Sequence, residues 1–172
     1  MSQEKPTKLG KYEIAQEVGR GSMGAVFKAH DPFIDRIVAV KMAIADALLD
    51  KNSSERFRKM FFNEAHTAGM LRHPNILDIF YAGVDEDKCY IVMEFVDDGN
   101  TLKEHITADK LLPLAQVAEI IFKCAQALDY AHRQGVIHRD IKPSNILLTE
   151  EFDIKIADFS IAHIARADMT ET

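Results

Sequence analysis

The most distinctive stretch of the sequence is His138-Arg139-Asp140-Ile141-Lys142-Pro143-Ser144-Asn145, and Asp158-Phe159-Ser160 begins thirteen residues after Asn145. If each residue type is used at about 5%, five fixed residues at these spacings arise by chance in on the order of one window in a few million. Short apolar runs, 146–148 and 154–157, separate the two polar groups. This part of the chain therefore holds an ordered set of polar side chains that composition alone does not explain.

Upstream of this block the hydrophobic pattern predicts both strands and helices. Alternation predicts strands over 12–18, 26–30 and 37–41, with two more near 76–80 and 90–94. Helices are expected from Asn52, where Glu55 completes a capping start, to His73-Pro74, and again from about Pro113 to His132. Strands followed by helices and short hairpins predict two small lobes joined near residues 95–101.

The first hairpin contains Gly19-Arg20-Gly21-Ser22-Met23-Gly24, which fits GxGxxG. A dinucleotide-binding fingerprint is excluded because Asp31-Pro32 leaves no room for the helix that should follow. A Walker loop is excluded because position 25 is Ala. Two interpretations stay open: a glycine hairpin that covers phosphates, and a plain hairpin turn.

Two opposite charges lie on faces that should be apolar. Lys41 shares a strand face with Ile37 and Ala39, and Glu64 lies in the helical stripe with Phe61 and Ala68. Pairing the two charges would hold the lysine head at a phosphate site. In the alternative, Lys41 snorkels to solvent and Glu64 lies at the edge of its stripe. Together with the glycine loop, the sequence favours the pair.

In their order along the chain these motifs closely resemble the protein kinase family, and residues 19–41 are most similar to bacterial, eukaryotic-like (Hanks-type) serine/threonine kinases. The resemblance implies an α+β, protein-kinase-like fold. Residues 1–10 would be a tail, and 11–97 a small lobe with a five-stranded antiparallel sheet and one helix. Residues 98–172 would be a truncated helical large lobe that ends in the activation segment, with nucleotide between the lobes.

The same resemblance implies the site residues. Asp140 would accept the substrate hydroxyl proton, Lys142 would neutralise the transferred phosphoryl group, and Lys41 oriented by Glu64 would hold the α- and β-phosphates. The metal would be Mg²⁺, with Mn²⁺ as an alternative, held by Asp158 and Asn145. His138 is interpreted as a packing residue. The nucleotide would contact the glycine loop, an apolar slot with Met93 as gatekeeper, and the hinge backbone: Val18, Gly19, Gly21, Gly24, Val26, Ala39, Met93, Glu94, Val96 and Leu147.

Regulation is also implied by the resemblance. Arg139 before Asp140 marks kinases that are switched by phosphorylation of the activation segment, since the guanidinium pairs with the new phosphate. Thr170 and Thr172 are the candidate phosphosites, and a frayed C-terminal tail is the alternative for both.

Two features depart from the family. Ser160 stands where Gly is usual, at a cost of about 1 kcal/mol if a left-handed backbone is required. We predict that Ser160→Gly changes the phosphoryl-transfer rate less than tenfold, and a larger gain in a kinase assay would refute this. The second departure is that no Ala-Pro-Glu segment follows Ser160 before Thr172.

The helix expected at 113–132 is apolar in nearly all directions. A helix of this kind is usually buried on all sides. Where later helices are missing, one of its flanks should form an exposed apolar patch. We therefore expect the chain to self-associate through that surface.

Composition limits the class of protein. Lys and Arg number 21 against 27 Asp and Glu, giving a formal charge of −6, so a nucleic-acid partner is not expected. The N-terminus lacks a signal peptide pattern, and no membrane segment is expected. Two cysteines without a CxxC pattern favour the cytoplasm.

The predicted function is ATP-dependent phosphorylation of Ser/Thr hydroxyls in proteins. The alternatives are a nucleotide-binding, catalytically impaired fragment that acts through protein contacts, and a broken piece of a longer kinase.

Overall fold

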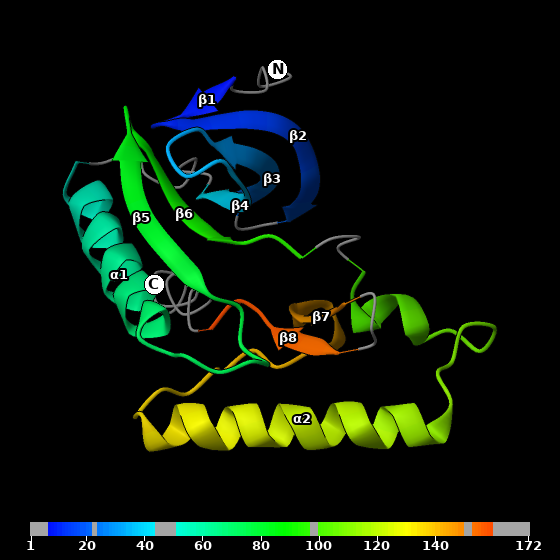
Figure 1. Cartoon of the computed structure of the whole chain (residues 1–172). Helices are drawn as coiled ribbons and strands as arrows, with labels where there is room; N and C mark the ends of the chain where they lie inside the picture. Colours follow the sequence, from blue (N-terminus) through cyan, green and yellow to red (C-terminus); the bar gives the residue numbers. More distant parts are fainter. Residues whose placement is uncertain (1–6, 22–23, 44–50, 97–99, 150–152, 160–172) are drawn as a thin grey trace. The chain divides into compact units, whose positions relative to one another are not determined.

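The computed structural model describes residues 7–21, 24–43, 51–96, 100–149 and 153–159 (Figure 1). The chain divides into two compact units. The first unit contains Met1–Ala65 and Ile79–Phe95, and the second contains His66–Asp78 and Val96–Thr172. Each unit is described by itself.

The first unit is built on a curled antiparallel sheet, shown in blue to green in Figure 1. Within the described residues the strand order is β1-β2-β3-β4-β6-β5. The bounds are β1 Lys8–Leu9, β2 Tyr12–Gly21, β3 Gly24–Asp31, β4 Arg36–Ala43, β5 Ile79–Asp85 and β6 Lys88–Glu94.

The sheet buries one row of alternating side chains. Val38, Val40 and Met42 of β4 are buried in a cluster with Phe27 of β3 and Val92 of β6. Each such side chain contributes about 1.5–3 kcal/mol when fully buried. This cluster stabilises the central strands, which carry the candidate nucleotide residues.

The sheet has six described strands, not the five expected. The sixth is β1, in a segment that the polar composition of residues 1–10 had marked as a tail. Leu9 is buried in the core cluster, and Gly10 turns the chain with a φ of +56° so that Leu9 pairs with Tyr12. The burial of Leu9 and the glycine turn therefore accompany a strand that the polar composition of this segment did not predict.

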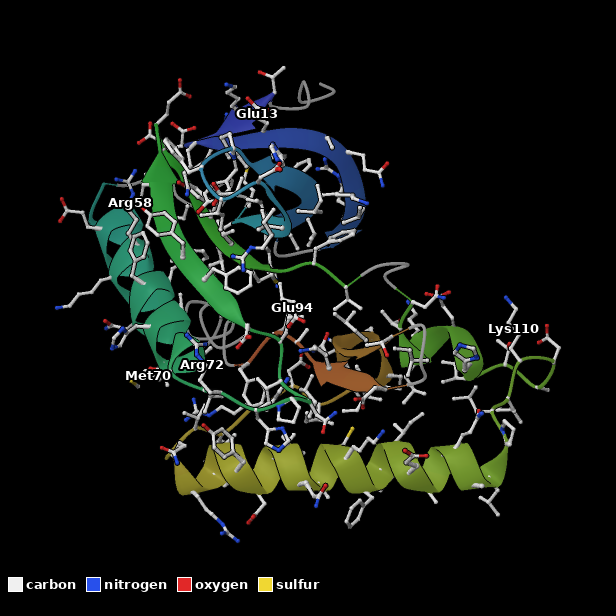
Figure 2. The ribbon with its side chains drawn as sticks, viewed as in Figure 1. Glu13, Arg58, Met70, Arg72, Glu94 and Lys110 are labelled. Carbon is white, nitrogen blue, oxygen red and sulfur yellow. The ribbon has the colours of Figure 1, made fainter. Side chains whose placement is uncertain are left out.

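Helix α1 (Lys51–Gly69) buries a stripe formed by Phe61, Ala65 and Ala68. Arg58, labelled in Figure 2, forms an ion pair with Asp87 of the β5–β6 turn at 2.8 Å. The side chain of Glu64 lies outside the described residues, so its expected pairing with Lys41 is not tested.

In its described residues the second unit contains the end of α1, one long helix and a two-stranded hairpin. Helix α2 spans Leu114–Arg133, β7 spans Ile146–Leu148 and β8 spans Ile154–Ile156, with short 3₁₀ turns η1 (Leu102–His105) and η2 (Pro143–Asn145). Lys110, labelled in Figure 2, lies between η1 and α2, and its carbonyl contacts His105 Nδ1 at 3.2 Å.

The strand expected near residues 76–80 is displaced. Strand β5 begins at Ile79, because Ile76 instead forms a parallel bridge with Ile156 of β8. An apolar run that reads as one strand is therefore shared between two sheets.

The long helix has both a buried and an exposed apolar flank. Ile120, Ala127 and Ala131 are buried, whereas Leu114 is 84% exposed and Ile121 and Phe122 are about equally exposed at 62% and 61%. The expected exposed apolar surface on this helix is confirmed.

Candidate functional site

The His138–Asn145 loop folds its polar side chains toward one another. Lys142 Nζ donates to Asp140 Oδ2 at 2.7 Å. Asn145 Nδ2 donates to the main-chain oxygen of Asp140 at 2.9 Å and to its Oδ2 at 3.2 Å. These three residues, dispersed over six positions, form one hydrogen-bonded cluster.

Asp140 is held in its ionised form. The hydrogen bond from Lys142 lowers the pKa of the Asp140 carboxyl below its usual range, and the Asn145 amide acts in the same direction. The Asp140 side chain remains one-third exposed. A carboxylate in this state can accept a hydrogen bond from an incoming hydroxyl group and orient it.

His138 is a buried residue that links the loop to the segment after β8. It is 1% exposed, and its Nε2 donates to the carbonyl of Ala157 at 2.8 Å while its Nδ1 accepts the N–H of Asp140 at 3.2 Å. Its ring packs on Phe159 with centroids 4.5 Å apart. Burial lowers the pKa of His138 and so favours the neutral ring, in agreement with its interpretation as a packing residue.

The main chain brings Asp158 beside this loop. The N–H of Ala157 donates to the carbonyl of Asn145 at 2.9 Å, and the Ala157 carbonyl is bound by His138. Asp158 and Arg139 both adopt left-handed backbone, with φ of 61° and 64°. Asn145 and Asp158, the two expected metal ligands, are therefore linked through one residue.

This donor set fits a hard divalent cation. Asn145 directs its amide N–H groups to Asp140, so its amide oxygen, the atom that ligates metals, points away from that carboxylate. An amide oxygen and one carboxylate are few ligands, but Mg²⁺ typically keeps waters and takes the rest from substrate phosphates. Among the described residues no cluster of three or more His, Cys, Asp or Glu side chains offers a competing metal site.

The first unit places most of the expected nucleotide residues on one face of the sheet. Across β2, β3, β4 and β6 one register row contains Gly19, Val26 and Lys41, and the neighbouring row pairs Ala39 with Met93. Directly paired residues, and residues two apart, lie on the same face. Val26, Ala39, Lys41 and Met93 therefore share that face.

The glycine hairpin closes this face at the Gly21–Gly24 pair. Val18 lies at a bulge between the Glu17 and Gly19 pairs and is 45% exposed. A Cβ atom added at Gly19 or Gly21 would meet nothing within 4 Å, whereas one at Gly24 would lie 2.0 Å from the Met42 carbonyl oxygen. Glu94 ends β6, and Leu147 and Val96 belong to the second unit.

Several expected residues fall outside the described part of the chain: Ser160, Thr170, Thr172 and the side chain of Glu64. Sequence reasoning also missed a buried polar residue, Asn75, which is hydrogen-bonded to the turn before β8. Its place after His73-Pro74 reads as an ordinary turn residue, and nothing in its spacing connects it with Asp153.

Comparison with known proteins gives a consistent result. The family model described as the protein kinase domain matches residues 12–172. Among curated proteins, the chain is 42% identical to a probable serine/threonine-protein kinase of Streptomyces coelicolor over 92% of its own length. It is 42% identical to the serine/threonine-protein kinase PrkC of Bacillus subtilis over 89% of its length.

The chain spans only about a quarter of those relatives, 24% and 23% of their lengths. Among solved structures it is similar to the kinase domain of Mycobacterium tuberculosis PknI, with a TM-score of 0.76 and 33% sequence identity. That match covers 90% of this chain and 61% of the solved chain.

Proposed function

Because this chain belongs to the protein kinase family, we propose that it transfers the γ-phosphoryl group of ATP to a serine or threonine hydroxyl of a protein substrate. The observation that carries the proposal is the cluster of Asp140, Lys142 and Asn145, joined through Ala157 to Asp158. The names of the curated relatives support the substrate class.

In the proposed reaction, Asp140 accepts the hydroxyl proton and orients the hydroxyl oxygen. That oxygen forms a bond to the γ-phosphorus while the bond from phosphorus to the β,γ-bridging oxygen breaks, and ADP leaves. Lys142, 2.7 Å from Asp140, offsets negative charge on the transferred group. Because phosphoryl transfer depends mainly on positioning and charge stabilisation, a low pKa of Asp140 is compatible with this role.

The nucleotide is proposed to lie on the face of the sheet that carries Val26, Ala39, Lys41 and Met93. Lys41 would bind the α- and β-phosphates, and Glu64 would orient it. The glycine hairpin would approach the phosphates through its main-chain N–H groups, and Val18, Leu147 and the main chain of Glu94 and Val96 would contact the base. The open space beside Gly19 and Gly21 leaves room for such an approach.

We propose that Asn145 and Asp158 hold Mg²⁺, with Mn²⁺ as an alternative. A bound divalent cation would neutralise phosphate charge during transfer. The fit of the donor atoms, an amide oxygen and a carboxylate, supports this assignment.

Regulation by the activation segment is a further part of the proposal. Arg139 next to Asp140 would pair with a phosphate on Thr170 or Thr172. Arg139 has a left-handed, strained backbone conformation. Residues with such strain are common at switch and catalytic sites.

A second copy of the chain is the proposed partner of the exposed apolar flank of α2. Its exposed side chains are Leu114, Ile121 and Phe122. A cytoplasmic location is also proposed, since Cys89 and Cys124 are both free thiols. None of the helices in the described part of the chain is long and apolar enough to cross a membrane.

Intact-mass spectrometry tests the lead function. Phosphate-free chain is incubated with Mg-ATP and a generic protein substrate, beside the Asp140→Asn variant. We expect a phosphate increment with the parent chain and none with the variant, because the amide cannot take up the hydroxyl proton. If both proteins leave all masses unchanged while Mg-ADP still raises their melting temperatures, the chain binds nucleotide without catalysing transfer.

A further inference from the structure

Strand β8 ends two residues before Asp158, one of the candidate metal ligands. Its last residue, Ile156, donates its N–H to the Asn75 carbonyl at 2.9 Å, and its carbonyl accepts the N–H of Leu77 at 2.9 Å. The partner segment thus comes from about 80 residues earlier in the chain, in the connection between α1 and β5. This connection and β8 both belong to the second unit.

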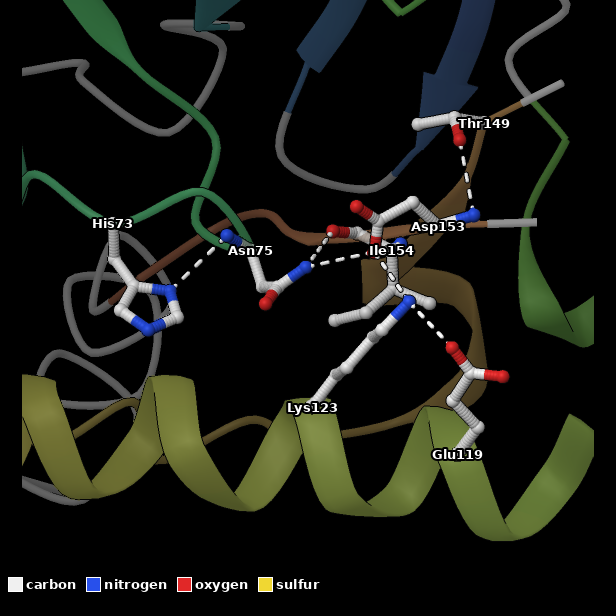
Figure 3. A network of polar contacts seen from close by, with 7 residues as sticks. All are labelled: His73, Asn75, Glu119, Lys123, Thr149, Asp153 and Ile154. Carbon is white, nitrogen blue, oxygen red and sulfur yellow. Dashed lines mark hydrogen bonds and ion pairs between the residues drawn. The ribbon is translucent and has the colours of Figure 1, made fainter. Parts of the chain in front are cut away.

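The Asn75 side chain holds the other end of β8 (Figure 3). It is 6% exposed, and its Nδ2 donates to Asp153 Oδ1 at 2.9 Å and to the Ile154 carbonyl at 3.0 Å. A carboxylate and a carbonyl can only accept, so the chemistry of the partners decides which way the amide faces. The main-chain N–H of Asn75 donates to His73 Nδ1 at 3.1 Å.

Helix α2 contributes a lysine that contacts the same oxygen atom of Asp153. Lys123 Nζ lies 3.1 Å from Asp153 Oδ1 and 2.8 Å from Glu119 Oε1 (Figure 3). Burial acts to raise the pKa of Asp153, but the Ile154 N–H and Lys123 outweigh it and the pKa lies below its usual range. Asp153 is therefore an anion that Asn75 and Lys123 share.

Beyond β8 the same hydrogen-bonded path enters the site. Ala157 is bound on one side by Asn145 and on the other by His138, and Asp158 follows it. A strand of three residues is a short, stiff connection of about 10 Å. A change in register or position at Asn75 would move Ala157, and with it the main chain that carries Asp158.

We propose that Asn75, braced through Asp153 by Lys123, is a positioning residue for the metal ligand Asp158. This inference rests on the proposed function, since it assumes that Asp158 binds the divalent cation. The substitution Asn75→Ala would then weaken metal binding in the nucleotide complex and leave nucleotide binding without metal unchanged. Supporting residues around metal ligands typically change metal affinity by about 10- to 100-fold.

Calorimetric titration with ADP, in excess EDTA and in Mn²⁺, gives the first readout. The affinity gained from Mn²⁺ should fall by about tenfold in Asn75→Ala, and the affinity in EDTA should stay within about twofold of the parent. Lys123→Met should show a smaller loss of the same kind. Lys123→Arg keeps a cation beside Asp153 and Glu119 and should restore the parent value. If Asn75→Ala does not fold, the comparison of Lys123→Met with Lys123→Arg still tests the proposal.

Arg133→Met is the matched control. It removes the cation of another i,i+4 pair on α2, Arg133 with Asp129, at the end away from Asp153. It should leave both affinities at their parent values. If this control also loses the increase in ADP affinity that Mn²⁺ gives, the effect comes from helix stability and the proposal is overturned.

Amide hydrogen exchange gives a readout that needs no nucleotide. The Ala157 N–H, bound to Asn145, should exchange at least about tenfold faster in Asn75→Ala than in Arg133→Met. Unchanged exchange, or faster exchange with a full Mn²⁺ gain, would overturn the proposal. If the parent chain itself gains no ADP affinity from Mn²⁺, the proposed function fails, and the exchange of Ala157 alone then decides whether Asn75 positions this segment.

Discussion

Two residues without the freedom of glycine adopt left-handed backbone in the candidate site. Arg139 and Asp158 have φ of 64° and 61°, where a side chain costs about 1 kcal/mol or more. Each lies next to a residue that is held by hydrogen bonds. Beside Arg139, His138 Nδ1 accepts the N–H of Asp140. Beside Asp158, Ala157 donates its N–H to the Asn145 carbonyl and accepts from His138 Nε2. These hydrogen bonds of the neighbouring residues help to offset the strain of the two left-handed positions.

At the residue scale, His138 predicts a pH dependence of stability. Burial lowers its pKa, so in the range between its folded and unfolded values the unfolded chain binds the extra proton. The free energy of unfolding should therefore fall as the pH drops below about 6.5, the ordinary histidine value. Urea unfolding at pH 7.5 and pH 5.5 measures this loss.

The variant His138→Gln serves as the comparison, since glutamine offers a donor and an acceptor but does not titrate. Its stability at pH 7.5 can be lower than that of the parent without affecting the test. The decrease between pH 7.5 and 5.5 should be smaller in the variant. An equal decrease in both proteins would show that other groups carry the pH dependence.

At the scale of an element, the glycine hairpin predicts a difference between two of its glycines. Gly24 has a φ of +149°, and a Cβ atom there would lie 2.0 Å from the Met42 carbonyl oxygen of the neighbouring strand. Gly24→Ala should therefore lower the free energy of unfolding by about 2–4 kcal/mol. Urea denaturation of the purified variant measures the change.

Gly21→Ala is the matched control within the same hairpin. A Cβ atom at Gly21 meets nothing within 4 Å, so the unfolding free energy should stay within about 0.5 kcal/mol of the parent. Equal losses in the two variants would mean that both glycines are needed for backbone freedom. The stated difference would mean that only Gly24 is needed for the packing of β3 on β4.

At the scale of the whole molecule, the exposed flank of α2 predicts self-association. Light scattering at micromolar concentration should give the mass of a dimer or larger assembly. Replacing both Ile121 and Phe122 with Gln should shift this mass to that of one chain, because the double variant removes two apolar side chains that are more than half exposed.

Exposed side chains contribute little to folding stability. The free energy of unfolding of the double variant should therefore differ from that of the parent by no more than about 0.5 kcal/mol for each substitution. The variant Leu111→Gln, at an exposed apolar residue before α2, is the control for general surface hydrophobicity. A monodisperse monomer of the parent chain would contradict the prediction directly.

The limits of sequence reasoning are clearest in single contacts. Asp140, Lys142 and Asn145 could be identified as a group because they lie within six residues, and the loop geometry brings such neighbours together. Asn75 could not, because its partner Asp153 lies 78 residues away. Likewise, Ile76 could not be assigned to β8 rather than β5 from apolar character alone.

Residue type and local spacing were enough to predict the family and most of the strands and helices, and the polar residues proposed for the site were also named from local spacing. Tertiary structure alone decided that Leu9 adds a sixth strand, that Asn75 holds β8, and that Gly24 rather than Gly21 lacks room for a side chain. Each of these depends on which distant segment fills the neighbouring space. That choice is made by the packing of the whole unit and is not written in any local pattern.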